Sequence, residues 1–292
     1  MNWMKFKWLF FLLSALVLVP GIISLLLFGL KPAIDFTGGS LLELKTEKPL
    51  EANETGSLIA EKGFEVLSVQ TSGENQVLIR LQPITKEQAE EIKTAIKEKF
   101  AQEPEEVRFE TVGPTLGKEL IRKTIWAIIL AAGFILAYVA WRFKDVKFGV
   151  CAILAMFHDT FILLGSFSLL GHFLGVEVDT LFVTALLTIL SFSVHDTIVV
   201  YDRIRETQKL SSQTSLVNFI NQAVTETLNR SVNNSLTIIF MLIALLLLGG
   251  TTIKWFVAAL LIGTISGTYS STFTAAPLLV VWDEIAKRRK KK

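Results

Sequence analysis

Residues 180–206 read TLFVTALLTILSFSVHDTIVVYDRIRE. The apolar run 180–201 is long enough to cross a membrane, because a helix needs about 20 apolar residues to span ~30 Å of hydrocarbon. Asp196 lies inside this run, where hydrocarbon does not solvate a carboxylate. Charged residues are rare at such depth and usually take part in function. The stretch therefore predicts a membrane-spanning helix that carries a working polar group.

The whole chain has the composition of a membrane protein. Of its 292 residues 51% are hydrophobic, and the formal net charge is only +2. We expect the first apolar stretch to be a span rather than a cleaved signal peptide, because it is too long and no small-residue cleavage site precedes Lys31. We predict six spans, at residues 8–30, 124–141, 147–171, 180–201, 231–249 and 254–282.

Basic residues gather on one side of these six spans. Cytoplasmic connections of membrane proteins carry an excess of Lys and Arg. We therefore expect both termini to be cytoplasmic. The basic residues that share this side are Lys5, Lys7, Arg142, Lys144, Lys147, Arg203, Arg205, Lys209 and those of the tail 287–292.

The long connection 31–122 lies on the opposite side of the membrane. It holds 12 Lys and Arg against 17 Asp and Glu, a net charge of −5. Its pattern predicts a ferredoxin-like β-α-β-β-α-β domain, in which a capping box of Thr85 and Gln88 begins the second helix. A loop without a fold of its own is the alternative. The elements are strand Ser40–Thr46, helix Glu51–Lys62, strands Glu65–Thr71 and Gln76–Gln82, helix Thr85–Phe100 and strand Glu106–Val112.

These features divide the chain into four parts. A first span (1–30) precedes the extracytoplasmic domain (31–122), and a five-helix bundle (123–282) and a basic tail (283–292) follow it. Within the bundle, residues 202–230 read as a cytoplasmic loop with an amphipathic surface helix. We expect the tail to meet anionic lipid rather than nucleic acid. Cys151 is the only cysteine, which excludes a disulfide within the chain.

Arg230 lies at a depth similar to that of Asp196. At 1.5 Å per residue, Asp196 is ~9 Å from Asp202, where the cytoplasmic charges begin, and Arg230 is ~9 Å from the apolar run that starts at Leu236. The two side chains could pair between neighbouring helices, and protonation of the carboxylate would then disturb the pair. The alternative is that Arg230 reaches to the cytoplasmic interface and Asp196 is a structural hydrogen-bonding group.

The triplet His-Asp-Thr occurs twice, at His158-Asp159 in the third span and at His195-Asp196 in the fourth. The first pair reads as a structural tie between helices or as an accessory proton relay. His195 either relays protons or forms a hydrogen bond. An intramembrane hydrolase is a poor alternative, because the sequence holds no His-Glu-x-x-His motif and no serine in a recognisable nucleophile arrangement.

Several motifs resemble the SecF family of bacterial protein-export membrane proteins. They are Asp35-Phe36-Thr37-Gly38-Gly39 after the first span, Val112-Gly113-Pro114 before the second, residues 193–206, and Leu228-Asn229-Arg230-Ser231 at the start of the fifth. The resemblance covers almost the whole chain. Two residues depart from the family pattern, Ala33 in place of a glycine and His195 in place of a small polar residue.

The resemblance implies a function. Such a protein works with SecD beside the SecYEG channel, and indirectly with SecA, to draw preproteins across the inner membrane of a bacterium with the proton-motive force. Asp196 would carry the proton and Arg230 would be its partner, without enzyme activity, cofactor or metal. Because six helices with inward polar groups make half of an RND-type bundle, a proton-driven exporter of small molecules or lipids is the alternative. The glycines at the joints of the domain, Gly38, Gly39, Gly113 and Gly117, are candidate hinges.

Overall fold

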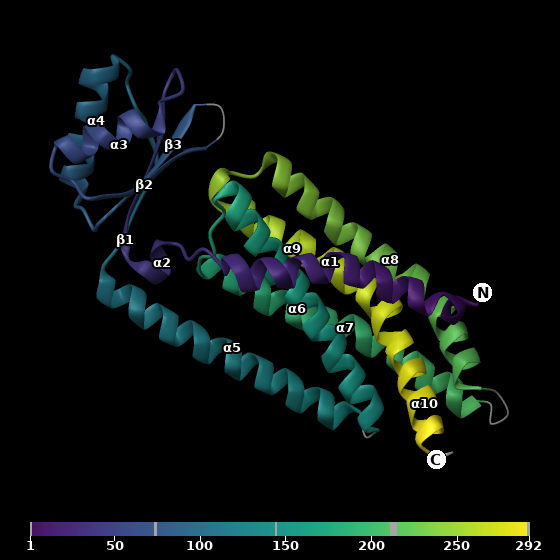
Figure 1. The fold of residues 1–292 in the computed structure, drawn as a ribbon. Coiled ribbons are helices and arrows are strands. Elements are labelled where there is room, and N and C mark those ends of the chain that lie inside the picture. Colours follow the sequence, from purple (N-terminus) through teal and green to yellow (C-terminus); the bar gives the residue numbers. More distant parts are fainter. Residues whose placement is uncertain (1, 73–74, 144, 211–214, 291–292) are drawn as a thin grey trace. The chain divides into compact units, whose positions relative to one another are not determined.

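The computed structural model describes residues 2–72, 75–143, 145–210 and 215–290 (Figure 1). They form two compact units, one of Pro32–Ile125 and the other of Met1–Lys31 with Trp126–Lys292. Within these described residues, six helices are long and apolar enough to span a membrane, and the smaller unit contains a four-stranded sheet. The predicted fold class is confirmed.

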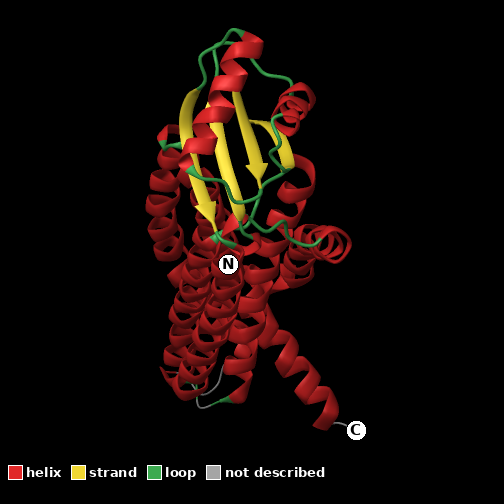
Figure 2. Cartoon of the chain, turned by 90° about the vertical axis from the view of Figure 1, so that its left-hand side faces the viewer, coloured by secondary structure: helices red, strands yellow, loops and turns green. Residues whose placement is uncertain are grey.

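The smaller unit is a sheet with two helices, as the pattern of residues 31–122 predicts. All strand pairs are antiparallel, and the order β2-β3-β1-β4 places β1 in the interior of the sheet (Figure 2). The elements are α2 (Ile34–Thr37), β1 (Gly39–Lys45), α3 (Ala52–Glu61), β2 (Val66–Ser72), β3 (Gln76–Leu81), α4 (Lys86–Phe100) and β4 (Glu105–Val112).

The core of this unit lies between the sheet and the two longer helices. Leu42 and Leu44 of β1 are fully buried with Ile79 of β3, and Ile59 of α3 and Ile92 of α4 pack into the same cluster. The predicted capping box is present, since Thr85 accepts from the backbone of Gln88 and the Gln88 side chain bonds back. The unit therefore has a hydrophobic core of its own.

The larger unit contains the spans. Before the first lies a short 3₁₀ turn, η1 (Trp3–Phe6), and the last span contains a π-helical turn that the sequence pattern does not predict. The helices are α1 (Lys7–Phe28), α5 (Pro114–Arg142), α6 (Val146–Leu174), α7 (Thr180–Leu210), α8 (Leu216–Leu248), and the last span built from α9 (Thr251–Ser270), the π-turn η2 (Ser271–Ala275) and α10 (Ala276–Lys290). The start of α5 belongs to the smaller unit.

Small residues let these helices approach closely. A Cβ added to Gly263 of α9 would fall 2.4 Å from Ile189 of α7, so only glycine fits there. The buried residues of α1 are Ser14, Gly21 and Ser24, and Ser24 bonds to Ser168 of α6. Most of α1 is therefore an apolar surface suited to lipid, held to the bundle by a narrow line of small side chains.

The predicted connection at 202–230 is mostly helical, and its cytoplasmic location stays a prediction. α7 continues to Leu210 and α8 begins at Leu216, so nearly all of the loop belongs to two long helices. Charges at the polar ends of the two helices are paired: Arg203 bonds to Glu226 across the two helices at 2.5 Å. Lys144, Lys291 and Lys292, which support the predicted orientation, lie outside the described residues.

Candidate functional site

Asp196 lies where three membrane helices meet. Its side chain is buried, with 7% exposed. Ser231 of α8 donates a hydrogen bond to its Oδ2 at 2.7 Å, and Ser271 of η2 donates to the same oxygen at 2.5 Å. In the part of the chain that the structure describes, Oδ1 has no hydrogen-bond partner. One oxygen of this carboxylate is therefore held by hydroxyls while the other remains able to accept a proton.

Asp196 and Arg230 form no ion pair among the described contacts, and a shared role in proton coupling stays a prediction. Arg230 is exposed, whereas the next residue, Ser231, is buried against the carboxylate. Successive residues of a helix point about 100° apart, so only one of the two can face Asp196. The helix brings the hydroxyl to the carboxylate and turns the guanidinium outward.

Arg230 instead lines a polar hollow of about 420 Å³ between α7 and α8. Val199, three residues after Asp196, also lines it, so the hollow ends about one helical turn from the carboxylate. The remaining lining residues belong to the polar ends of the two helices: Asp202, Arg203, Glu206, Glu226 and Thr227. Water in this hollow would come within a short distance of the site.

Asp159 is the centre of a second buried network. It is 1% exposed, and each of its oxygens has two contacts. Oδ2 accepts from Ser193 at 2.6 Å and from Ser270 at 2.5 Å. Oδ1 accepts from Ser266 at 2.6 Å and lies 3.0 Å from Nδ1 of His158. Unlike Asp196, this carboxylate is fully occupied, which favours a structural or positioning role over that of a relay. The Nε2 of His158 is buried and has no partner among the described residues.

The π-turn η2 joins the two networks. Ser270, the last residue of α9, bonds to the α6 carboxylate, and Ser271, the first of η2, bonds to Asp196. At the other end of the turn, the buried hydroxyl of Tyr201 donates to the backbone carbonyl of Ala275 at 2.9 Å. π-turns recur at functional sites in proteins. Here the turn is fixed to α7 at two places.

His195 points away from the Asp196 network and is exposed. On α7 it continues a line of exposed polar residues at helical spacing, and α8 carries a similar line. Polar side chains on membrane helices rarely face lipid. These lines, which we call the polar face, therefore need another protein or water beside them. The polar face consists of Thr184, Thr188, Ser191 and His195 on α7, and Asn229, Arg230, Asn233 and Asn234 on α8.

The candidate hinge glycines lie in a tightly packed turn of the smaller unit. Gly38 and Gly39 have φ of +76° and +120°, which other residues rarely adopt. A Cβ on Gly117 would fall 3.0 Å from the backbone nitrogen of Gly38, so the two joints of the domain lie against each other. Gly113 has neither a positive φ nor a close neighbour. Close packing explains three of the four glycines, and hinge motion stays a prediction.

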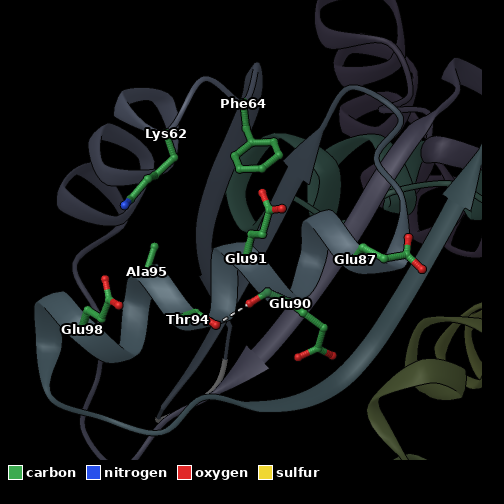
Figure 3. A pocket seen from close by; sticks show the side chains of 8 residues that line it. All are labelled: Lys62, Phe64, Glu87, Glu90, Glu91, Thr94, Ala95 and Glu98. Atoms are coloured by element: carbon green, nitrogen blue, oxygen red, sulfur yellow. Dashed lines mark hydrogen bonds between the residues drawn. The ribbon is translucent and has the colours of Figure 1, made fainter.

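The smaller unit also has a hollow of about 400 Å³ between the end of α3 and the face of α4 (Figure 3). Glutamates of α4 line it together with Lys62 and Phe64, which follow α3. Figure 3 shows the glutamates spaced along α4 and pointing in different directions rather than converging. No group of three or more His, Cys, Asp or Glu suited to a metal ion occurs in the described residues. The hollow therefore offers no recognisable chemistry, and the polar groups within the spans are the stronger candidate.

The sequence also matches known families. The profile described as protein export membrane protein SecD/SecF, C-terminal, matches residues 91–285, and the SecD/SecF GG motif matches residues 23–50. The chain belongs to the SecD/SecF family. The GG-motif match includes the turn at Gly38-Gly39, and the C-terminal match includes the spans from α5 onward.

Individual relatives support this assignment. The protein translocase subunit SecF of Thermobaculum terrenum is 45% identical, over 96% of this chain and 93% of the relative. The SecF subunit of Anaerolinea thermophila is 39% identical, over 95% and 92%. The crystal structure of SecDF, a translocon-associated membrane protein from Thermus thermophilus, matches with a TM-score of 0.86 and 35% identity, over 97% of this chain but only 39% of the SecDF chain.

The sequence identifies the two carboxylates of the candidate site, Asp159 and Asp196, but not their partners. Five serines and a tyrosine complete the networks, and nothing in their local sequence separates them from the other hydroxyl residues of the spans. One available signal is position, because Ser231 directly follows Arg230 and Ser193 lies three residues before Asp196. The serines are Ser193, Ser231, Ser266, Ser270 and Ser271, and the tyrosine is Tyr201.

Proposed function

We propose that proton transfer at Asp196 drives the work of this chain as an accessory subunit of the Sec protein translocase. The translocase role follows from the family and from relatives that are named as SecF and SecDF translocase subunits. One observation carries the proton step: the buried Asp196 carboxylate is shared by three helices and keeps one oxygen free of hydrogen bonds. Protons are the only coupling ligand in this proposal, with no cofactor.

The energetics of the site support a switch. A charged side chain at the centre of a membrane helix costs about 2.5–3.5 kcal/mol on insertion scales. Two hydroxyl donors offset part of this cost while Asp196 is ionised, and their contribution falls when a proton neutralises the carboxylate. Protonation therefore weakens the junction of α7, α8 and η2. A potential of 100 mV supplies ~2.3 kcal/mol for each charge that crosses, which is comparable with such a change.

The last span offers a route from this junction to α1. Thr274 of η2 lies 3.2 Å from the hydroxyl of Ser14, and Tyr269 of α9 donates to the backbone of Phe10 at 2.7 Å. α1 leads along the chain into the α+β domain, which begins at Pro32. In our proposal a movement of the last span reaches α1 through these bonds, and α1 then moves the domain that faces emerging preproteins.

SecD is the suggested partner. Two relatives named SecDF are much longer than this chain. The region that matches this chain makes up 35% of the Thermus thermophilus protein and 37% of the Bacillus subtilis protein. The rest of each chain is large enough to hold a second bundle. We propose that a SecD bundle covers the polar face of α7 and α8, because that face is unsuited to lipid.

The same role suggests the membrane in which the chain lies and the proteins beside it. The chain is a multi-pass membrane protein. We propose that it lies in the bacterial inner membrane with both termini in the cytoplasm, beside the SecYEG channel and indirectly in contact with SecA. The polar hollow at Arg230 would then open to the cytoplasm and give the proton its exit. The basic C-terminal end would meet anionic lipid.

The test is export of a preprotein by membranes in which Asp196→Asn replaces the parent chain. The amide keeps the shape of the carboxylate and cannot release a proton, so we expect proton-dependent stimulation of export to disappear while the chain still inserts. Asp283→Asn is the control for the same substitution, since Asp283 lies on α10 of the last span and pairs with Lys287 outside the site. Export by Asp196→Asn at the level of this control would rule out the proton step.

A further inference from the structure

Two consecutive serines of the last span bond to two carboxylates on different helices. Ser270 donates to Asp159 of α6 and Ser271 to Asp196 of α7, each at 2.5 Å. Neighbouring residues of a helix point about 100° apart, so the last span can serve both only if it is held in one rotational setting. A rotation that improved either hydrogen bond would spoil the other. The geometry of the two bonds is therefore linked.

The two ends of this link differ in how firmly they are held. Asp159 has four contacts on its two oxygens, from Ser193, Ser266, Ser270 and His158. It is 1% exposed, so water does not compete for these bonds. Two of the four contacts, Ser266 and Ser270, come from the last span. Asp159 thus anchors that span on its α6 side, directly beside the residue that touches Asp196.

The π-turn makes the anchor necessary. A π-turn widens the i→i+4 hydrogen-bonding pattern of the α-helix to i→i+5 and is rare in proteins. η2 has such contacts on its α7 side, at Ser271 and at the carbonyl of Ala275 that Tyr201 binds. The bond of Ser271 weakens when its acceptor is neutralised, so that contact cannot by itself fix the turn throughout a cycle. One residue earlier, the bond from Ser270 to Asp159 supplies a contact that does not depend on the proton state of Asp196.

We propose that Asp159 is a positioning residue for Asp196. Asp159 acts through Ser270 and the π-turn, and so holds the Ser271 hydroxyl on the Asp196 carboxylate. This deepens the proposed function, on which it rests for its biological purpose. In this proposal no proton passes through Asp159. Its loss would release Ser271 and change the chemistry of a carboxylate on another helix.

The test measures the reactivity of Asp196 in the full chain, purified with its SecD partner. Dicyclohexylcarbodiimide modifies protonated carboxyl groups within membranes, and mass spectrometry gives the rate at Asp196. Ser271→Ala removes a donor that favours the ionised form, so we expect the rate to rise roughly tenfold, the size typical of one hydrogen bond to a charged group. Asp159→Asn and Ser270→Ala should raise the rate by a similar factor.

Ser193→Ala is the matched control. It removes a bond of 2.6 Å to the same oxygen of Asp159, but from α7, and leaves the last span untouched. We expect its rate at Asp196 to stay within about twofold of the parent, below the effect of one charged hydrogen bond. Ser270→Ala retains the carboxylate, so it keeps the test decisive if Asp159→Asn fails to fold.

A double variant separates positioning from general loosening. If Asp159 acts through Ser271, Asp159→Asn combined with Ser271→Ala should react at the rate of Ser271→Ala alone. Rates that multiply in the double variant would overturn the proposal, as would parental reactivity of Asp196 in Asp159→Asn, Ser270→Ala or Ser271→Ala. A rise in Ser193→Ala equal to that in Ser270→Ala would also overturn it, because it would reveal only a loosened bundle.

The outcome is independent of the export assay. If export by Asp196→Asn equals the parent level, the proton step fails, but the reactivity series still decides whether Asp159 positions Ser271. Conversely, if the modification rate of Asp196 is the same in the parent and in all variants, the positioning role of Asp159 is ruled out. The export result for Asp196→Asn is unaffected by that outcome.

Discussion

Gly21 of α1 and Gly165 of α6 touch backbone to backbone. A Cβ added to Gly165 would fall 2.5 Å from the Cα of Gly21, a distance that real Cβ atoms do not tolerate. Ser24 and Ser168, one turn further along, are joined at 2.8 Å. Since α1 buries few other residues, this contact and its neighbours decide whether α1 stays on the bundle.

We expect Gly165→Ala to destabilise the chain, because the new methyl group must push α1 away and disturb the serine pair. Overpacking of this kind costs about 1–3 kcal/mol. Gly133→Ala on α5 is the control, since a Cβ there meets nothing within 4 Å and alanine favours a helix. Thermal unfolding in detergent would measure both. Equal melting temperatures for the two variants would show that the α1 contact adjusts without cost.

Arg230→Leu should impair export although Arg230 forms no ion pair with Asp196. The guanidinium lines the polar hollow near the site, and leucine would make the inner end of that hollow apolar and exclude water. Arg230→Lys keeps a charge at the same place and should retain more activity. Export by reconstituted membranes under a proton gradient would compare the two. Full activity of Arg230→Leu would mean that the hollow is not the proton exit.

The polar face makes a prediction about the partner. A photo-reactive amino acid at Ser191 or Asn233 should cross-link to SecD in native membranes, because both positions are exposed and polar within a span. The same probe at Leu16, which is 70% exposed on apolar α1, should label lipid instead. Cross-links to SecD from Leu16 but not from Ser191 or Asn233 would place the SecD interface on α1 rather than on the polar face of α7 and α8. That result would contradict our proposal.

Glu43 gives the α+β domain a pH dependence. It is 4% exposed, and burial raises its pKa, an effect that the charge of Arg108 partly opposes. The folded domain therefore favours the neutral acid. Stability from this group is present below the unfolded pKa of about 4.5 and is lost as pH rises through the raised value. Glu43→Gln should thus raise the melting temperature of the isolated domain, residues 32–125, more at pH 8 than at pH 4.

Glu103→Gln is the control of opposite sign. Glu103 is exposed and its hydrogen bond with Lys97 lowers its pKa, so its small contribution is present at neutral pH and is lost as pH falls. Its replacement should leave the melting temperature unchanged or slightly lower at pH 8. If Glu43→Gln behaved in the same way, the burial of Glu43 would carry no electrostatic cost.

Much of the fold follows from the sequence alone. The six spans are readable because each must supply about 20 apolar residues to the membrane, a requirement that holds without regard to neighbours. The α+β domain is readable for a similar reason, since the capping box at Thr85 and the apolar spacing of Ile92 and Ile96 are local signals. Asp196 is identified as important because a charge in an apolar run is unusual in any context.

The partners of Asp196 were decided by tertiary structure. Depth along the helices allows a pair with Arg230, but the rotation of α8 turns Ser231 to the carboxylate, and rotation depends on how whole helices pack. The extent of α7 and α8 through most of residues 202–230 is likewise visible only in the structure, where Arg203 of α7 pairs with Glu226 of α8. The π-turn, which brings Ser270 and Ser271 to two carboxylates over 70 residues away in sequence, has no local signal, because its contacts come from residues of two other helices, α6 and α7.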